Sequence, residues 1–226
     1  MKPRLAIFDC DGTLADSEAS IVDAVAAAFG EHGLARPGRE QIVAQIGLSI
    51  DEFLAAVAPD LSASRAREVL GSYRGHFTRL REERGADPLF DGMRDLLDAL
   101  HSDGVLLGVA TGKSRRGLLR FLQAHELLDH FATLQSADDA PSKPHPGMIV
   151  RALEETGSSA DESVMIGDTS FDIEAARNAG VTGIGVDWGH HSASTLRRAG
   201  ASFVARDAPS LRAHLFGNAA NDHRNM

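Results

Sequence analysis

Apolar residues along the chain follow two alternating patterns. Short runs that are apolar throughout are typical of parallel strands covered on both faces, because such strands lack the alternation of half-exposed ones. Between these runs, apolar residues three and four positions apart predict amphipathic helices. The alternation of strand and helix predicts an open α/β sheet with right-handed crossovers. The predicted strands are residues 5–8, 105–109, 131–134, 164–166 and 183–186.

One long segment departs from this alternation. Residues 16–85 contain no predicted strand, and their apolar spacing predicts four helices. Because this helical segment follows the first strand, we expect an inserted helical cap, with linkers near residues 14–17 and 84–90. The predicted organisation is an α/β core domain of residues 1–15 and 86–217, a cap domain of residues 16–85, and a polar tail of residues 218–226.

Composition and charge narrow the class of protein. The 226 residues carry a net charge of −9, which argues against nucleic acid as the main ligand. Cys10 is the only cysteine, so no intramolecular disulfide can form and a reducing cytoplasm is expected. No stretch approaches the ~20 apolar residues of a membrane span. We therefore expect a cytoplasmic monomer or homodimer with no nucleic-acid or membrane partner.

The first candidate for chemistry is the motif Asp-Cys-Asp-Gly-Thr at residues 9–13, directly after the first predicted strand. Two carboxylates placed there lie at the carboxyl edge of the sheet, where open α/β sheets bind their ligands. Asp9 can act as a nucleophile and Asp11 as a general acid and base. The alternative is a plain Asp-Gly turn.

A second pair of carboxylates, Asp168 and Asp172, follows the apolar run at 164–166. The two residues lie about one helical turn apart, so both can face one crevice. Their alternative role is to cap a helix N-terminus. If they converge with Asp9 and Asp11, the carboxylates repel one another unless a cation holds them, and Mg²⁺ prefers such oxygen ligands.

Two further motifs suit the binding of a phosphoryl group. Thr111 lies in Ala-Thr-Gly-Lys-Ser at residues 110–114, where a hydroxyl and free backbone N–H groups can cradle phosphate, although Thr111 can also be a helix N-cap. Lys143 is flanked by two nearby prolines, which favours a positioned ammonium over a solvated lysine.

Taken together, the four motifs resemble those of the haloacid dehalogenase superfamily of phosphatases. Residues 16–85 resemble the small α-helical cap of its phosphoglycolate phosphatase and β-phosphoglucomutase branch. The resemblance implies a Rossmann-like parallel-sheet core. It also implies a Mg²⁺-dependent phosphatase that hydrolyses a small phosphorylated metabolite through an aspartyl-phosphate.

The resemblance also implies roles for individual residues. Asp9 is expected to be the nucleophile and a metal ligand, and Asp11 the acid and base that gives its main-chain carbonyl to the metal. Asp168 is expected to be a metal ligand, and Asp172 either a ligand or a partner of the ligands. The residues expected to hold the phosphoryl group are Thr111, Gly112 and Lys143.

Departures from related chemistries leave three functions open. Dehalogenating members lack the second Asp of the first motif, which is present here as Asp11. Phosphonoacetaldehyde hydrolases need a cap lysine for a Schiff base, and residues 16–85 contain none. Phosphoglycolate is the expected substrate on branch resemblance alone. The alternatives are a mutase like β-phosphoglucomutase and a non-catalytic binding protein on the same fold.

For the remaining candidate residues, the sequence does not favour a functional role over a structural one. The turn at residues 46–49 can approach a small ligand or simply join two helices. Arg115 and Arg116 can attract an anionic substrate or form a solvated helix face. We expect His190 and His191 to belong to a loop that packs near the site.

Overall fold

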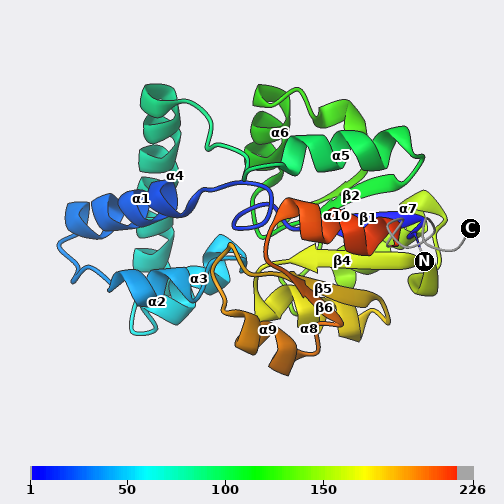
Figure 1. Cartoon of the computed structure of the whole chain (residues 1–226). Coiled ribbons are helices and arrows are strands. Elements are labelled where there is room, and N and C mark those ends of the chain that lie inside the picture. The colour runs from blue at the N-terminus through cyan, green and yellow to red at the C-terminus, as the bar shows by residue number, and fades with distance from the viewer. Residues whose placement is uncertain (1, 218–226) are drawn as a thin grey trace, which may run out of the picture.

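Six parallel strands form one sheet in residues 2–217, the part of the chain that the computed structural model describes. Their order is β3-β2-β1-β4-β5-β6, so the first strand lies at the centre (Figure 1). The parallel sheet with helices on both faces confirms the predicted α/β core. The strands are β1 (Leu5–Phe8), β2 (Leu106–Ala110), β3 (Phe131–Gln135), β4 (Ser163–Gly167), β5 (Thr182–Val186) and β6 (Phe203–Ala205).

The register of the central strands brings their carboxyl ends together. Phe8, the last residue of β1, is paired with Val109 of β2 and with Ile166 of β4. All four residues of β1 are buried, as expected of a strand covered on both faces. The loops that follow β1, β2 and β4 therefore meet at one edge of the sheet.

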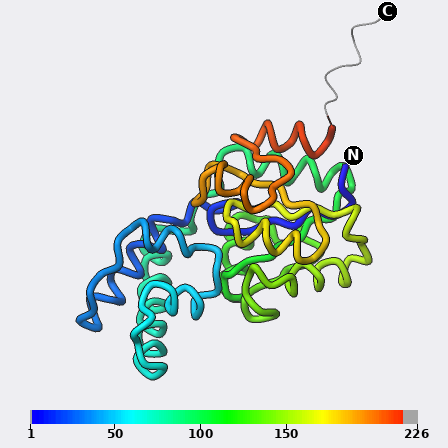
Figure 2. Tube along the Cα trace, turned by 90° about the horizontal axis from the view of Figure 1, so that it is seen from below, coloured from blue at the N-terminus to red at the C-terminus, as the bar shows by residue number. Residues whose placement is uncertain are grey.

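Helices cover both faces of the sheet (Figures 1 and 2). Apolar residues of α5 (Met93–Ser102), α6 (Arg115–Ala124) and α10 (Ala208–Phe216) join one hydrophobic cluster. Those of α7 (Gly147–Thr156) and α8 (Ser170–Asn178) join another, and α9 (Ala193–Ala199) packs beside α8. Short 3₁₀ turns at Leu128–His130 and Ala160–Glu162 precede β3 and β4.

Strands β3, β4 and β5 extend one residue beyond the prediction at one or both ends, and two further strands differ more clearly. Strand β2 lies one residue further along the chain than predicted, and β6 was not predicted. Strand β6 has only three residues, of which two are half-buried, so it lacks a continuous apolar run. It lies at the edge of the sheet, where pairing with β5 alone defines it.

The segment after β1 consists of four cap helices, α1 (Glu18–Glu31), α2 (Arg39–Val43), α3 (Ile50–Val57) and α4 (Ala63–Arg84), as the sequence predicted. They lie to one side of the sheet (Figure 2) and bury a hydrophobic cluster of their own. Its fully or nearly fully buried members include Val25, Ile42, Phe53 and Val69.

Two chain segments connect the cap helices to the core, and they lie side by side. The backbone N–H of Asp16 donates to the Pro88 carbonyl at 2.9 Å, and that of Phe90 to the Leu14 carbonyl at 3.0 Å. The predicted tail, residues 218–226, lies outside the described residues. Within residues 2–217, no helix combines the length and the apolar character that crossing a membrane requires.

Candidate active site

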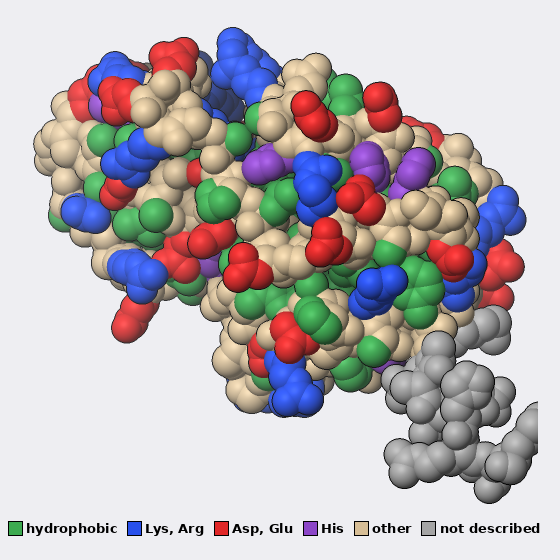
Figure 3. Space-filling model, turned by 45° about the horizontal axis from the view of Figure 1, so that its top comes forward, with side chains coloured by type: hydrophobic (Ala, Val, Ile, Leu, Met, Phe, Trp, Pro, Cys, Tyr) green, Lys and Arg blue, Asp and Glu red, His purple; other side chains and the backbone are tan. Residues whose placement is uncertain are grey.

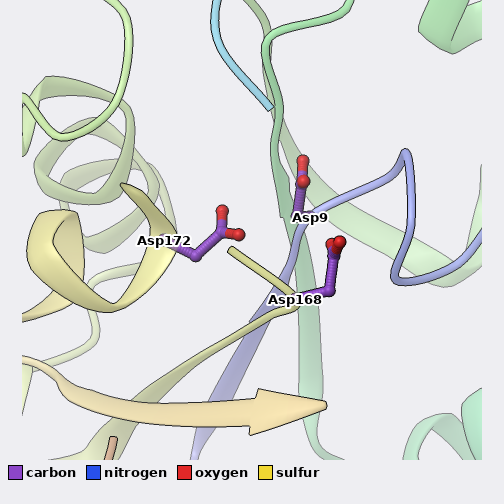
Figure 4. A group of neighbouring side chains, drawn as sticks. All are labelled: Asp9, Asp168 and Asp172. Carbon is purple, nitrogen blue, oxygen red and sulfur yellow. The ribbon is translucent and has the colours of Figure 1, made fainter. Parts of the chain in front are cut away.

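Three carboxylates meet at the carboxyl edge of the sheet (Figure 4). Asp9 follows β1, Asp168 follows β4, and Asp172 lies in the first turn of α8. Each offers an oxygen within 4.8 Å of the other two, and all three side chains are fully buried. Negative charges this close require a compensating cation.

Asp9 is the least satisfied of the three. Among the described residues, Oδ2 of Asp9 has no hydrogen-bond partner, and Oδ1 has only an ion pair with Lys143. Burial, together with the charges of Asp172 and Asp168, outweighs the nearby Lys143 and raises the pKa of Asp9 to about 8. An oxygen without a partner in a buried, anionic pocket is available for a metal ion or for attack on a substrate.

Lys143 supplies the protein's own cation. Its Nζ lies 2.9 Å from Oδ1 of Asp9 and 2.5 Å from Oδ1 of Asp172, and it donates to the Ala110 carbonyl at 3.2 Å. The side chain is fully buried, so the alternative of a solvated lysine is wrong. Burial opposes the charge, but Asp172 and Asp9 outweigh it and hold the pKa of Lys143 above its ordinary value.

Asp172 both belongs to the carboxylate cluster and caps the N-terminus of α8. Its Oδ2 accepts hydrogen bonds from the Thr169 backbone N–H at 3.0 Å and from the Thr169 hydroxyl at 2.7 Å. Thr169 is the N-cap of α8, so Asp172 completes a capping box. With Oδ1 on Lys143 and Oδ2 on Thr169, both oxygens are engaged within the protein.

Asp168 is held by residues from two other segments. Its Oδ1 accepts from the Thr13 hydroxyl at 2.8 Å, and its Oδ2 accepts from the His190 backbone N–H at 2.8 Å and lies 2.7 Å from His190 Nδ1. Burial would raise the pKa of Asp168, but the contacts with His190 dominate and lower it. Gly12, at φ +88°, leaves room for this pair, because a Cβ there would lie 2.3 Å from Oδ2 of Asp168. His190, expected only to pack nearby, therefore positions a predicted site residue.

The side chain of Asp11 is not part of the three-carboxylate cluster and is bound by other residues. Its Oδ1 lies 2.7 Å from Nζ of Lys113 and accepts from the Ser17 hydroxyl at 2.6 Å. Burial favours the neutral acid, but the Lys113 charge and both hydrogen bonds prevail and lower the pKa of Asp11. The carboxylate of Asp11 therefore lies outside the three-carboxylate cluster, and its expected contact with the metal, through the main-chain carbonyl, stays a prediction. Lys113, which sequence reasoning did not single out, holds this carboxylate ionised.

Thr111 and Gly112 lie at the tip of β2, beside this cluster. The N-cap of α6 is Ser114, whose hydroxyl accepts from the Gly117 N–H, so the alternative of Thr111 as the N-cap is wrong. The Thr111 side chain is buried and accepts a hydrogen bond from the Lys113 N–H at 3.2 Å. The Thr111 backbone N–H donates to the Gln135 carbonyl at 3.0 Å, so both groups of Thr111 are held within the protein.

The turn at residues 46–49 of the cap lies directly over this strand tip. A Cβ on Gly112 would lie 2.3 Å from the Leu48 carbonyl oxygen, and one on Gly47 would lie 3.3 Å from the Thr169 side chain. The Ser49 backbone N–H donates to the Ser142 hydroxyl at 2.8 Å. The turn therefore does more than join two helices, because it also lies against the candidate site.

Replacing Gly112 by alanine tests this contact. Because the new methyl group cannot coexist with the Leu48 carbonyl, Gly112→Ala displaces the cap turn, and we expect kcat/KM to fall roughly tenfold to a hundredfold. Gly71→Ala is the matched control, since a Cβ at Gly71 in α4 meets nothing within 4 Å. Steady-state kinetics on both variants measure the effect, and equal activity would contradict the role of this contact.

Comparisons with known proteins identify the family of this chain. The sequence profile of the haloacid dehalogenase-like hydrolases matches residues 6–186. A protein of Dickeya dadantii named "Probable phosphatase IndB" is 34% identical over 201 residues, which cover 88% of this chain and 87% of that protein. A phosphoglycolate phosphatase of Agrobacterium fabrum is 32% identical over 192 residues, covering 82% and 81%.

The fold comparison agrees with the sequence comparison. The crystal structure of a hydrolase from Pseudomonas syringae superposes with a TM-score of 0.85 at 27% identity, covering 95% of this chain and 98% of that one. The chain belongs to the haloacid dehalogenase-like hydrolase family, and its phosphatase relatives place it among the phosphoric monoester hydrolases. The resemblance inferred from the four motifs is confirmed.

Proposed function

We propose that this phosphatase depends on Mg²⁺ and hydrolyses a small phosphorylated metabolite through an aspartyl-phosphate on Asp9. The observation that carries the proposal is the state of Asp9. Its carboxylate lies buried at the edge of the sheet between two further carboxylates, with Lys143 Nζ 2.9 Å from its Oδ1 and with no hydrogen-bond partner on its Oδ2 among the described residues.

The residues present fit a small divalent cation. Asp9, Asp168 and Asp172 offer oxygen atoms within 4.8 Å of one another, and oxygen is the ligand that Mg²⁺ prefers. Asp9 and Asp168 are the ligands we propose, together with the main-chain carbonyl of Asp11. Asp172, whose oxygens bind Lys143 and Thr169, is proposed as the partner that holds Lys143. A bound Mg²⁺ would offset the charge of the substrate phosphate.

The proposed reaction proceeds in two displacements at phosphorus. An oxygen of Asp9 attacks the phosphorus atom and the bond to the leaving-group oxygen breaks, while protonated Asp11 donates its proton to that oxygen. Water then attacks the phosphorus of the aspartyl-phosphate, the bond to Asp9 breaks, and Asp11 accepts the proton of the water. Lys143, Thr111 and Gly112 bind the oxygens of the transferring phosphoryl group.

Lys113 and Ser17 suit Asp11 to the second of these steps. They hold its carboxylate ionised, which is the form that accepts a proton from water. For the first step Asp11 takes up a proton from solvent when substrate binds, and the proton that it gains from water in the second step returns to solvent, so protons balance over each turnover.

We also propose residues 16–85 as a cap domain that closes over the core of residues 1–15 and 86–217. Its own hydrophobic cluster and the two adjacent linkers support this division. The turn at residues 46–49, packed on Gly112, would exclude bulk water during phosphoryl transfer. One chain carries every residue of the proposed site, so the mechanism needs no second copy. The cytoplasmic location expected from the single cysteine stays a prediction.

Phosphate release from a panel of phosphomonoesters with Mg²⁺ tests the proposal, with the Asp9→Asn protein as the blank. Phosphoglycolate belongs in the panel because of the branch resemblance and the name of the Agrobacterium relative. Isomerisation of a sugar phosphate that depends on glucose 1,6-bisphosphate, with little free phosphate, would favour the mutase alternative. Metal binding without any turnover would favour the non-catalytic alternative.

A separate prediction concerns the metal ligands. Asp168→Asn keeps the volume of the side chain but removes its charge, so we expect Mg²⁺ to bind at least about tenfold more weakly. The Mg²⁺ concentration that gives half-maximal activity measures the change. Asp60→Asn, at an exposed position, is the control. An unchanged metal dependence would remove Asp168 from the ligand set.

A further inference from the structure

A pocket of about 230 Å³ lies between the cap helices and α6. Asp11, Gly112 and Lys113 form the part of its wall nearest to the three-carboxylate cluster. Because Asp11 is the proposed donor of a proton to the leaving oxygen, the pocket is where the leaving group of the substrate lies. The residues that line the pocket therefore indicate which kind of leaving group it can bind.

One side of the pocket is apolar and partly aromatic. Its wall includes Ile21 of α1, Phe53 of α3 and Tyr73 and Phe77 of α4, and Ile46 of the cap turn adds to it. A two-carbon leaving group such as glycolate has almost no apolar surface to bury against these side chains. The wall instead suits an apolar body with an aromatic ring, which can pack against the edges of Tyr73 and Phe77, two rings that stack on one another with centroids 5.7 Å apart.

The rest of the lining is strongly cationic. Five of its residues are basic, namely Arg74, Arg81, Lys113, Arg116 and Arg120, and Asp11 is its one acidic residue. In a chain of net charge −9, such a local excess of positive charge calls for an anionic ligand. Figure 3 shows Lys and Arg side chains at the upper edge of the molecule, where the left-hand lobe meets the rest.

These cations divide into two groups. Lys113 pairs with Asp11 and Arg81 pairs with Asp87, so both are already engaged within the protein. Within residues 2–217, Arg74, Arg116 and Arg120 make neither an ion pair nor a side-chain hydrogen bond, and all three are exposed. They come from α4 and α6, on opposite sides of the same pocket. Three unengaged guanidinium groups suit a carboxylate or phosphate at the outer end of a ligand.

We propose that the leaving group of the substrate is an aromatic body that carries a second anionic group. The body lies against Tyr73 and Phe77, and the anion is bound by Arg74, Arg116 and Arg120. The proposal rests on the phosphatase function proposed above and specifies its substrate class. It disfavours phosphoglycolate, whose carboxylate lies too close to the phosphoryl group to leave room for such a body.

Four esters of similar alcohols test the proposal in the presence of Mg²⁺: ethyl phosphate, phosphoglycolate, benzyl phosphate and 4-carboxybenzyl phosphate. All four release a primary alcohol, so their intrinsic reactivities are similar. We expect kcat/KM for benzyl phosphate to exceed that for ethyl phosphate at least about tenfold, because the ring is buried. We expect the added carboxylate to raise it about tenfold again, through charged hydrogen bonds.

Variants then identify the residues that bind the anion. In Arg74→Ala/Arg116→Ala/Arg120→Ala, we expect the ratio of kcat/KM for 4-carboxybenzyl phosphate to that for benzyl phosphate to fall to about one. Arg79→Ala is the matched control, an exposed arginine on α4 that does not line the pocket, and it should keep the wild-type ratio.

The possible results separate this proposal from the one on which it rests. Turnover with phosphoglycolate as the best of the four esters, or with no gain from ring or carboxylate, would overturn the substrate class and leave the phosphatase function standing. No phosphate release from any phosphomonoester would overturn both proposals.

Discussion

Asp9→Asn is expected to abolish phosphate release, with a loss of at least about a thousandfold, while the fold is retained. Asparagine has the shape of aspartate but cannot form the aspartyl-phosphate, and a neutral amide is a poor ligand for Mg²⁺. Phosphate release under saturating substrate measures the loss. Asp16→Asn is the matched control, because Asp16 is exposed in the adjacent linker and should keep wild-type activity.

The same variant has an expected effect on stability with a definite sign. The pKa of Asp9 rises from 3.8 in a model peptide to about 8 in the folded protein. At pH 7 the carboxyl ionises more readily in the unfolded chain, so its ionisation favours unfolding. Removing the charge should therefore not lower the free energy of unfolding of the metal-free protein. Urea unfolding at pH 7 measures it. Marked destabilisation, or activity retained by Asp9→Asn, would contradict the role given to this carboxylate.

Lys143→Met is expected to be the most destabilising substitution among these. It removes the buried cation that lies 2.9 Å from Asp9 and 2.5 Å from Asp172, and it leaves buried carboxylates without a partner. Breaking a buried pair in this way costs about 3–5 kcal/mol of unfolding free energy. Phosphate release should also be lost, because Lys143 is proposed to bind the phosphoryl oxygens.

Added Mg²⁺ should restore part of the stability lost in Lys143→Met, because a cation among the three carboxylates replaces part of the missing charge. The control is Lys2→Met, which removes an ion pair with Asp103 between side chains that are 43% and 48% exposed. Such a surface pair contributes only about 0–1 kcal/mol. Urea unfolding of both variants, with and without Mg²⁺, makes the comparison. Equal stability of the two variants would contradict the importance of the buried cation.

Much of the fold could be predicted because burial imposes a visible pattern. Strands β1, β4 and β5 are covered on both faces and therefore appear as continuous apolar runs. Helix α1 carries the spacing of an amphipathic helix, with Ile21, Val25 and Ala28 on its buried face. Strand β6 could not be found in this way, because a three-residue edge strand is defined by its pairing with β5 and not by its composition.

The candidate site, too, could be predicted only in part from the sequence. Asp9, Asp168 and Asp172 follow strand ends, and the parallel register brings strand ends to one edge, so their proximity could be anticipated. The contacts of Lys113 and His190 could not. Lys113 meets Asp11 across 102 positions of sequence, and His190 reaches Asp168 from the loop after β5. Nothing in the local sequence marks either contact, because each depends on how two loops fold over the edge of the sheet.

Trapping the covalent intermediate tests the transfer of phosphate to Asp9 most directly. The protein would be quenched in acid during turnover of a ³²P-labelled phosphomonoester with Mg²⁺, digested, and searched for labelled peptides. We expect one label, removable by hydroxylamine as an acyl phosphate is, on the peptide that contains Asp9, and none in Asp9→Asn. Turnover without label on that peptide, or label that persists in Asp9→Asn, would contradict an aspartyl-phosphate at Asp9.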